Sequence, residues 1–207
     1  MSDLGKTVLC ANIIQFLKSD KQTTVLYHFC NDYRSNEINS LSVILRSFCY
    51  QLLQAQPDLC SYLYDEFIWK AQNATVQNIL QALSAMLKGF DTVRMIVDGL
   101  DEWDPQGIKK ILIELMGLTT EDIDENVTHK LLISSRDVAH ISRILSKKPS
   151  IALSEEVRAV DAAIRAYAHA GIESLRSNMD NKVDYKILQD IENKIVKKAH
   201  GMFLILN

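Results

Sequence analysis

Residues 93–104 read Val93-Arg94-Met95-Ile96-Val97-Asp98-Gly99-Leu100-Asp101-Glu102-Trp103-Asp104. The apolar run at residues 95–97 is rich in β-branched side chains and predicts a strand that is buried on both faces of a parallel sheet. The run stops at Asp98, and four carboxylates fall within residues 98–104. Because open α/β sheets bind ligands beyond the carboxyl ends of their strands, we expect these acids to lie at a ligand-binding edge.

Two interpretations of this acidic stretch are open. In the first, Asp98 at the strand tip holds Mg²⁺ through its water shell, and the later acids Asp101 and Glu102 orient or deprotonate a water. In the second, the strand is followed by an ordinary solvated turn, since Asp-Gly is a common turn pair. The position of the acids directly after a buried strand favours the first interpretation.

Composition limits the class of protein. The chain has 207 residues, of which 47% are apolar, with 23 basic and 26 acidic side chains and a net charge of −3. The length predicts one domain, or one domain with a smaller appendage, and the charge balance favours neither nucleic acid nor a membrane surface as partner. The cysteines, Cys10, Cys30, Cys49 and Cys60, lack paired metal-binding spacing. We expect reduced, buried thiols in a cytoplasmic protein that lacks a signal peptide and membrane spans.

Strands and helices alternate in the first three quarters of the chain. Further buried strands are predicted over residues 23–30 and 130–135, with another possible strand at residues 150–153. The helices expected from apolar periodicity cover residues 6–17, 40–56, 57–69, 75–87, 105–116, 138–145, 155–176 and 182–199. This alternation indicates a parallel sheet with right-handed crossovers, followed after Leu153 by an all-helical part.

Gly5-Lys6-Thr7 stands at the start of the first predicted helix. N–H groups and the dipole at a helix N-terminus attract phosphate, the lysine reaches phosphate oxygens, and the threonine hydroxyl ligates Mg²⁺. A complete phosphate-binding loop has another glycine five positions earlier. We therefore expect the first half of the loop, and the strand that feeds it, to be missing. The alternative is an ordinary helix start with an exposed lysine.

Arg136 directly follows the strand predicted over residues 130–135. It should lie on the same sheet edge as Asp98, because the carboxyl ends of parallel strands meet there. The arginine could reach the terminal phosphate of a nucleotide, or it could pair with an acid of residues 98–104. The spacing favours both interpretations equally.

These signals occur in a fixed order: Gly5-Lys6-Thr7, then Met95-Ile96-Val97-Asp98-Gly99-Leu100-Asp101-Glu102, then Leu131-Leu132-Ile133-Ser134-Ser135-Arg136. Together they resemble the NACHT domain of STAND-class P-loop NTPases, especially those of fungal NLR-like receptors. Residues 29–34, 45–53 and 198–204 resemble the same group, so the resemblance covers nearly the whole chain.

The resemblance implies an α/β fold over residues 1–153: a three-layer P-loop NTPase with a parallel sheet that lacks its first strand. It implies a small helical domain over residues 154–207. Mg²⁺ with ATP or ADP is the implied cofactor. Gly5, Lys6 and Thr7 would bind the phosphates, and Thr7 and Asp98 would hold the Mg²⁺.

The remaining site residues follow from the same resemblance. Asp101 and Glu102 would position the attacking water, and Arg136 would contact the γ-phosphate. In the family, ATP binding drives self-association and signalling in innate immunity, and slow hydrolysis restores the resting state.

Two departures from the family pattern motivate an alternative function. Without the first strand, the strand at residues 130–135 should have an unpaired edge. The chain also stops where a winged-helix domain would follow. The alternative is a non-catalytic interaction module, or a degenerate fragment of such a receptor, that has lost nucleotide binding and contacts other receptor domains or a second copy.

Overall fold

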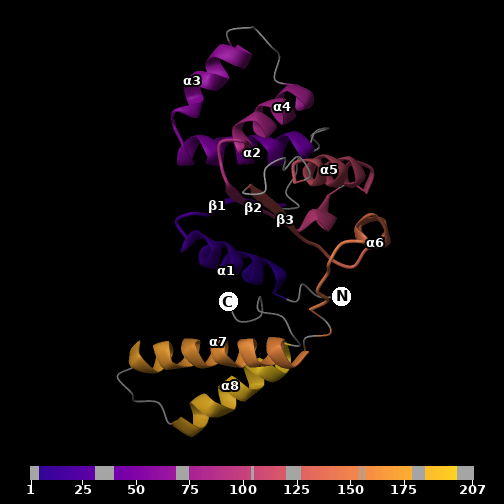
Figure 1. Cartoon of the computed structure of the whole chain (residues 1–207). Coiled ribbons are helices and arrows are strands. Elements are labelled where there is room, and N and C mark those ends of the chain that lie inside the picture. Colours follow the sequence, from indigo (N-terminus) through magenta and orange to yellow (C-terminus); the bar gives the residue numbers. More distant parts are fainter. Residues whose placement is uncertain are drawn as a thin grey trace. The chain divides into compact units, whose positions relative to one another are not determined.

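The computed structural model describes residues 5–30, 40–68, 75–103, 105–119, 127–153, 155, 157–178 and 185–199. In chain order its elements (Figure 1) are α1 (Lys6–Lys18), β1 (Thr24–Phe29), α2 (Ser40–Ala55), α3 (Leu59–Leu63), the π-helical turn η1 (Tyr64–Ile68), α4 (Val76–Leu87), β2 (Thr92–Asp98), the 3₁₀ turn η2 (Leu100–Glu102), α5 (Pro105–Gly117), β3 (Thr128–Ser134), α6 (Ala139–Leu145), α7 (Val157–Asn178) and α8 (Tyr185–Ala199). The described chain forms two compact units. One runs from Leu9 to Lys147, and the other comprises the residues from Lys148 onward together with Gly5–Val8.

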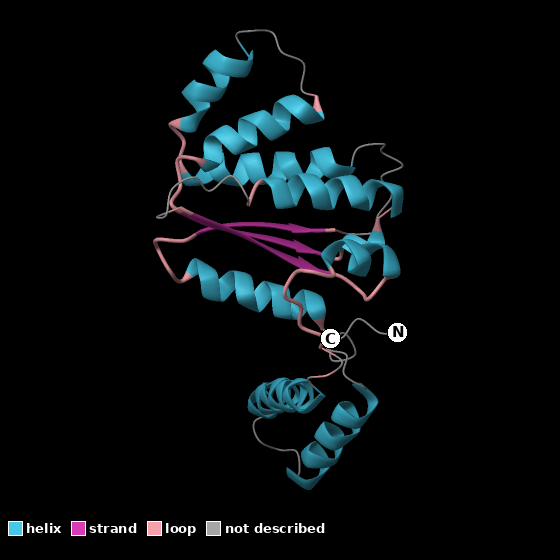
Figure 2. Cartoon of the chain, turned by 45° about the vertical axis from the view of Figure 1, so that its right-hand side comes forward, coloured by secondary structure: helices cyan, strands magenta, loops and turns pink. Residues whose placement is uncertain are grey.

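Three parallel strands form the sheet of the first unit, in the order β1-β2-β3. The register pairs Ile96 of β2 with Tyr27 of β1 and with Leu132 of β3. Helices α2, α4 and α5 lie on one face of the sheet and α1 lies on the other (Figure 2). The prediction of an α/β fold with a parallel sheet between helical layers is confirmed.

Residues 95–97 of the central strand are apolar, and the two faces of the strand pack on different cores. Met95 and Val97 belong to the larger core, which is formed with α2, α4 and α5, and both are fully buried. Ile96 faces the other way, where it packs with Cys10 and Ile14 of α1. Burying a side chain of this size contributes about 1.5–3 kcal/mol. The strand therefore fixes the positions of both helical layers.

Some expectations about the elements are wrong. Residues 150–153 do not form a strand, and Ile151 is 83% exposed. The helix expected over residues 57–69 divides into α3 and the turn η1, and Cys60 within it is exposed rather than buried. Leu132 of β3, expected to be buried, is 40% exposed, because β3 is an edge strand. Asp104 and residues 31–34 and 200–204 lie outside the described residues.

The two edges of the sheet differ. The outward-facing peptide of Tyr27 in β1 is bonded by one side-chain amide. Gln51 of α2 accepts from the Tyr27 N–H at 3.0 Å and donates to its carbonyl oxygen at 2.8 Å. On β3, the register turns the peptide groups of Leu131 and Ile133 toward the outer edge, where no strand in the described part of the chain pairs with them. The expectation of an unpaired edge on this strand therefore holds within the described residues.

The second unit contains the antiparallel pair of helices α7 and α8. A stripe at helical spacing on α7, Ile164, Ala168 and Ile172, is buried, as is Leu188 of α8. At the rim, His169 contacts Glu192 at 3.3 Å and Arg165 donates to Asn193 at 3.4 Å. The predicted all-helical character of residues beyond Leu153 agrees with these helices, and the predicted boundary between residues 153 and 154 stays a prediction.

Replacing Gln51 tests the closure of the β1 edge. Gln51→Ala leaves both peptide groups of Tyr27 without this partner in a partly buried position, which should cost about 1–3 kcal/mol. The measurement is the free energy of unfolding in urea. The control is Gln54→Ala in the same helix, because Gln54 is exposed and bonds only the Tyr50 hydroxyl, at 3.0 Å. Equal losses in the two variants would contradict the assignment.

Candidate functional site

A left-handed glycine ends the central strand and creates the acidic turn. Gly99 follows β2 with φ 75° and ψ 30°, and the 3₁₀ turn η2 starts at the next residue. The turn is closed by a hydrogen bond from the Glu102 N–H to the Gly99 carbonyl at 3.0 Å. Leu100, fully buried, anchors it to the core. Asp101 and Glu102 are therefore presented from a fixed turn rather than from a loose loop.

Backbone hydrogen bonds tie the three strand tips together at this point. The Cys30 N–H donates to the Asp98 carbonyl at 2.8 Å, and the Gly99 N–H donates to the Ser134 carbonyl at 2.9 Å. A Cβ on Gly99 would lie 2.9 Å from the Cys30 carbonyl oxygen, closer than real Cβ atoms approach. Only glycine fits both the φ angle and the space.

Asp98 is buried at the tip of the central strand. It is 4% exposed, and its register partner on β3 is Ser134. The thiol of Cys10, from α1, is hydrogen bonded to Asp98 and lies beside Ser134. Burial, and after it the negative charge of Asp98, raises the pKa of Cys10 to about 11. Asp98 is thus the most buried acid of the candidate site and lies between Cys10 of α1 and the strand tips.

The acids also surround Cys30, which follows β1. Burial raises the pKa of the Cys30 thiol to about 12, and the charges of Asp98, Glu102 and Asp101 add to this effect. On the same strand, the ring of His28 lies 5.9 Å from that of Trp103, and burial lowers the pKa of His28. His28 is therefore a packing residue beside the strand tip.

Arg136 pairs with an acid of the turn. Its backbone N–H donates to Asp101 Oδ1 at 2.8 Å, and its Nε lies 3.4 Å from Asp101 Oδ2. The Asp101 side chain is 5% exposed, whereas that of Arg136 is 48% exposed. Of the two positions that the sequence allowed for this arginine, the structure has the one on the acidic stretch.

The structure brings Asp98, Asp101, Glu102 and Arg136 to one edge of the sheet, where Glu102 is exposed to solvent. The other predicted site residues lie at the start of the described chain: Gly5 has φ 67° and directly precedes α1, whose first residues are Lys6 and Thr7. These three residues belong to the second unit.

Sequence reasoning missed Cys10 and Ser134. Ser134 is the last residue of β3 and pairs with Asp98, so a correct register would have identified it. Cys10 follows Thr7 by three residues, which places the two on one face of α1. The helical spacing therefore contained a signal for Cys10 as well.

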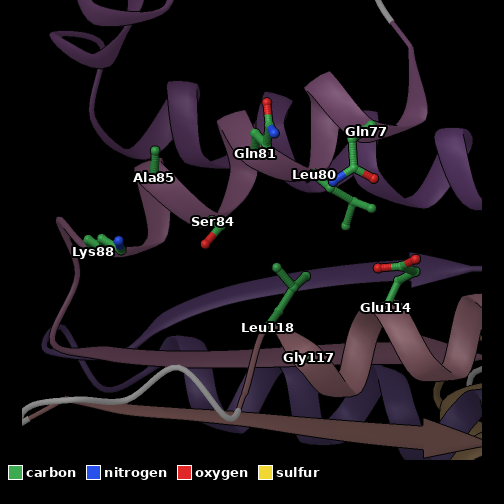
Figure 3. Close-up of a pocket in the computed structure, with 9 residues that line it drawn as sticks. All are labelled: Gln77, Leu80, Gln81, Ser84, Ala85, Lys88, Glu114, Gly117 and Leu118. Carbon is green, nitrogen blue, oxygen red and sulfur yellow. The ribbon is translucent and has the colours of Figure 1, made fainter.

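A second feature, a surface hollow of about 300 Å³, lies between α4 and α5 (Figure 3). Gln77, Gln81 and Ser84 of α4 line it, with Glu114 of α5 across from them. None of the residues predicted as a site lines this hollow. Ligand pockets enclose roughly 300–1,000 Å³, so this hollow lies at the lower limit of that range.

Two kinds of feature were not found among the described residues, a metal-ligand cluster and a membrane-spanning helix. Among the described residues, no three His, Cys, Asp or Glu side chains gather as a metal site. A search of the same residues finds no helix with the length and apolarity needed to cross a bilayer. A metal at the acidic edge would therefore need ligands from hydroxyl groups, water or a bound substrate.

The fold and the acidic edge together define a protein with a P-loop-like α/β fold, in which a parallel sheet carries acids at the tip of its central strand. Comparison with known proteins supports a family assignment. A model of the nephrocystin 3 N-terminal family matches residues 3–136, and the chain belongs to this family. The matched residues include β1, β2, β3 and the acidic turn.

The chain is also similar to the vegetative incompatibility protein HET-E-1 of Podospora anserina. The two are 25% identical over 211 residues, which cover 97% of this chain and 15% of HET-E-1. The chain therefore spans only a small part of that relative's length.

Gly99→Ala should destabilise the first unit. A left-handed conformation costs an L-residue about 1–2 kcal/mol, and the contact with the Cys30 carbonyl should bring the loss to roughly 2–4 kcal/mol. Unfolding in urea measures it. Gly107→Ala in α5 is the control, because a Cβ there meets nothing within 4 Å. A Gly99→Ala protein as stable as the control variant would contradict the tight strand-tip geometry.

The cysteines should differ in reactivity. At pH 8 an alkylating reagent should modify Cys60 rapidly, because Cys60 is exposed. Cys10, Cys30 and Cys49 should react slowly, because burial raises their pKa values to about 11, 12 and 12 and the thiolate is the reactive form. Mass spectrometry of the modified protein checks this. Cys60→Ser should remove the fast-reacting thiol, and unfolding should expose all the others. A second fast thiol in the folded protein would contradict the prediction.

Proposed function

We propose that this chain is a nucleotide-dependent switch module of the NACHT type, from the STAND class of P-loop NTPases, within a signalling receptor. The observation that carries the proposal is the buried carboxylate of Asp98 at the tip of the central parallel strand, followed by a rigid turn with Asp101 and Glu102. Arg136, which follows the neighbouring strand β3, joins the same edge through its contacts with Asp101.

In this proposal each residue has a distinct role. Lys6 contacts the β- and γ-phosphates of ATP, and backbone N–H groups from Gly5 onward bind phosphate oxygens. Thr7 and Asp98 hold Mg²⁺. The acids of the turn position the attacking water, and Arg136 contacts the γ-phosphate.

The donors of the chain fit a magnesium ion that arrives with a nucleotide. Mg²⁺ prefers oxygen ligands, keeps several waters and uses one or two carboxylates together with substrate phosphates, rather than a cage built by the protein. A buried carboxylate, Asp98, and a hydroxyl group, Thr7, match that donor set. When bound, Mg²⁺ would neutralise charge on the phosphates. The protein residues would bind and orient the nucleotide and would admit one water near the acidic turn.

The signalling part of the proposal rests on the similarity to HET-E-1, whose name describes a protein of vegetative incompatibility. We propose that ATP binding favours self-association or contact with other receptor domains, and that slow hydrolysis to ADP reverses it. Such a switch would act in the cytoplasm.

A titration with a fluorescent ATP analogue, with and without Mg²⁺, tests the proposal. Saturable, Mg²⁺-dependent binding is expected, and Lys6→Ala should weaken it at least ~10-fold, because one charge-assisted contact to phosphate contributes about 1.5–3 kcal/mol. Lys21→Ala is the matched control, because Lys21 lies in the exposed turn after α1. No saturation at millimolar nucleotide, or equal affinity of Lys6→Ala and Lys21→Ala, would contradict the proposal.

The open edge of β3 favours a second candidate function, a non-catalytic interaction module. The peptide groups of Leu131 and Ile133 face outward, and Leu132 is 40% exposed, which suits the addition of a strand from a partner. This function predicts association that rises with protein concentration and does not respond to ATP. A chain that stays monomeric and binds ATP would exclude it.

A further inference from the structure

We propose that the two acids of the turn have different roles: Asp101 is a positioning residue that holds Arg136, and Glu102 is the acid that positions the attacking water. This division rests on the proposed nucleotide site and refines it. The family resemblance assigns both acids to the water, and the geometry separates them.

The contacts of Asp101 leave it poorly placed to bind a substrate water. Oδ1 accepts the Arg136 N–H at 2.8 Å and Oδ2 lies 3.4 Å from Arg136 Nε, so both oxygens face the same residue. The side chain is 5% exposed. A group that positions a water must lie within hydrogen-bond distance of it, and both oxygens of this carboxylate are already directed at Arg136.

The same contacts define what Asp101 does. It joins the turn after β2 to the segment after β3 through one backbone and one side-chain interaction with Arg136. Nε is one of five N–H donors of a guanidinium, and the Arg136 side chain is 48% exposed. A guanidinium held at Nε keeps its plane and its position, which reduces the conformational freedom lost when its terminal nitrogens contact a phosphate.

Glu102 projects differently because successive residues of a 3₁₀ turn are rotated by a third of a turn. Glu102 is exposed, and its Oε1 lies 3.5 Å from the point where a Cβ on Gly99 would be. Its carboxylate therefore lies over the glycine at the end of the central strand, next to the tip that carries Asp98. This is the acid of the pair that solvent and a substrate water can reach.

Nucleotide affinity and turnover should separate the two roles. Asp101→Asn keeps an oxygen for the Arg136 N–H but removes the charge beside Nε, so nucleotide affinity should fall several-fold while bound nucleotide is still hydrolysed. Arg136→Gln should lose affinity by a similar factor. The double variant should lose little more than either single variant, because the two residues act as one unit. Glu102→Gln should bind ATP within about twofold of the wild type and lower kcat by roughly 10²-fold or more.

The readouts distinguish failure of this inference from failure of the nucleotide site itself. Wild-type binding that is lost in Lys6→Ala supports the site. With that result in hand, multiplicative losses of affinity for Asp101→Asn and Arg136→Gln would overturn the positioning role. Unchanged turnover in Glu102→Gln, or binding without any hydrolysis in the wild type, would overturn the role of Glu102. Urea unfolding of the wild type, Asp101→Asn, Arg136→Gln and the double variant tests the Asp101–Arg136 pair without nucleotide. Additive losses in the free energy of unfolding would also overturn the positioning role of Asp101.

Discussion

The site depends on one backbone constraint: three parallel strands must end together around a residue without a side chain. Gly99 takes a left-handed conformation, donates to β3 and lies against the carbonyl of Cys30 after β1. Because a Cβ cannot enter this space, only glycine can take this left-handed conformation here. The acids after Gly99 are therefore held at the sheet edge by the packing of strand tips, and their own interactions add to an arrangement that the backbone already determines.

The fold class and the acids that follow β2 could be predicted from the sequence. The predictions failed where the structure depends on contacts between residues far apart in the chain. The apolar run at β2 predicted a central buried strand because both faces of that strand are covered. Residues 150–153 contain a similar short apolar run, but Ile151 is exposed and no strand forms there. Short apolar runs do not carry enough information to separate a strand from a loop, since strand formation depends on partners far away in the chain.

The candidate site shows the same division. Asp98, Asp101 and Glu102 could be predicted because they follow a recognisable strand. The partner of Arg136 could not, because its two possible contacts differ only in the orientation of a turn relative to a neighbouring strand. Ser134 and Cys10 were missed for a related reason: their approach to Asp98 depends on strand register and on the rotation of α1, which no local pattern specifies. The roles of the predicted residues in nucleotide binding stay predictions.

The burial of Asp98 bears most directly on function. Removing a carboxylate from water is costly unless hydrogen bonds and opposite charge compensate it. Burial raises the pKa values of the Cys10 and Cys30 thiols, and the negative charge of Asp98 beside them adds to this effect. In the proposed nucleotide site, the buried carboxylate at the tip of the central strand is the oxygen ligand that the protein would offer to a Mg²⁺ ion arriving with the nucleotide.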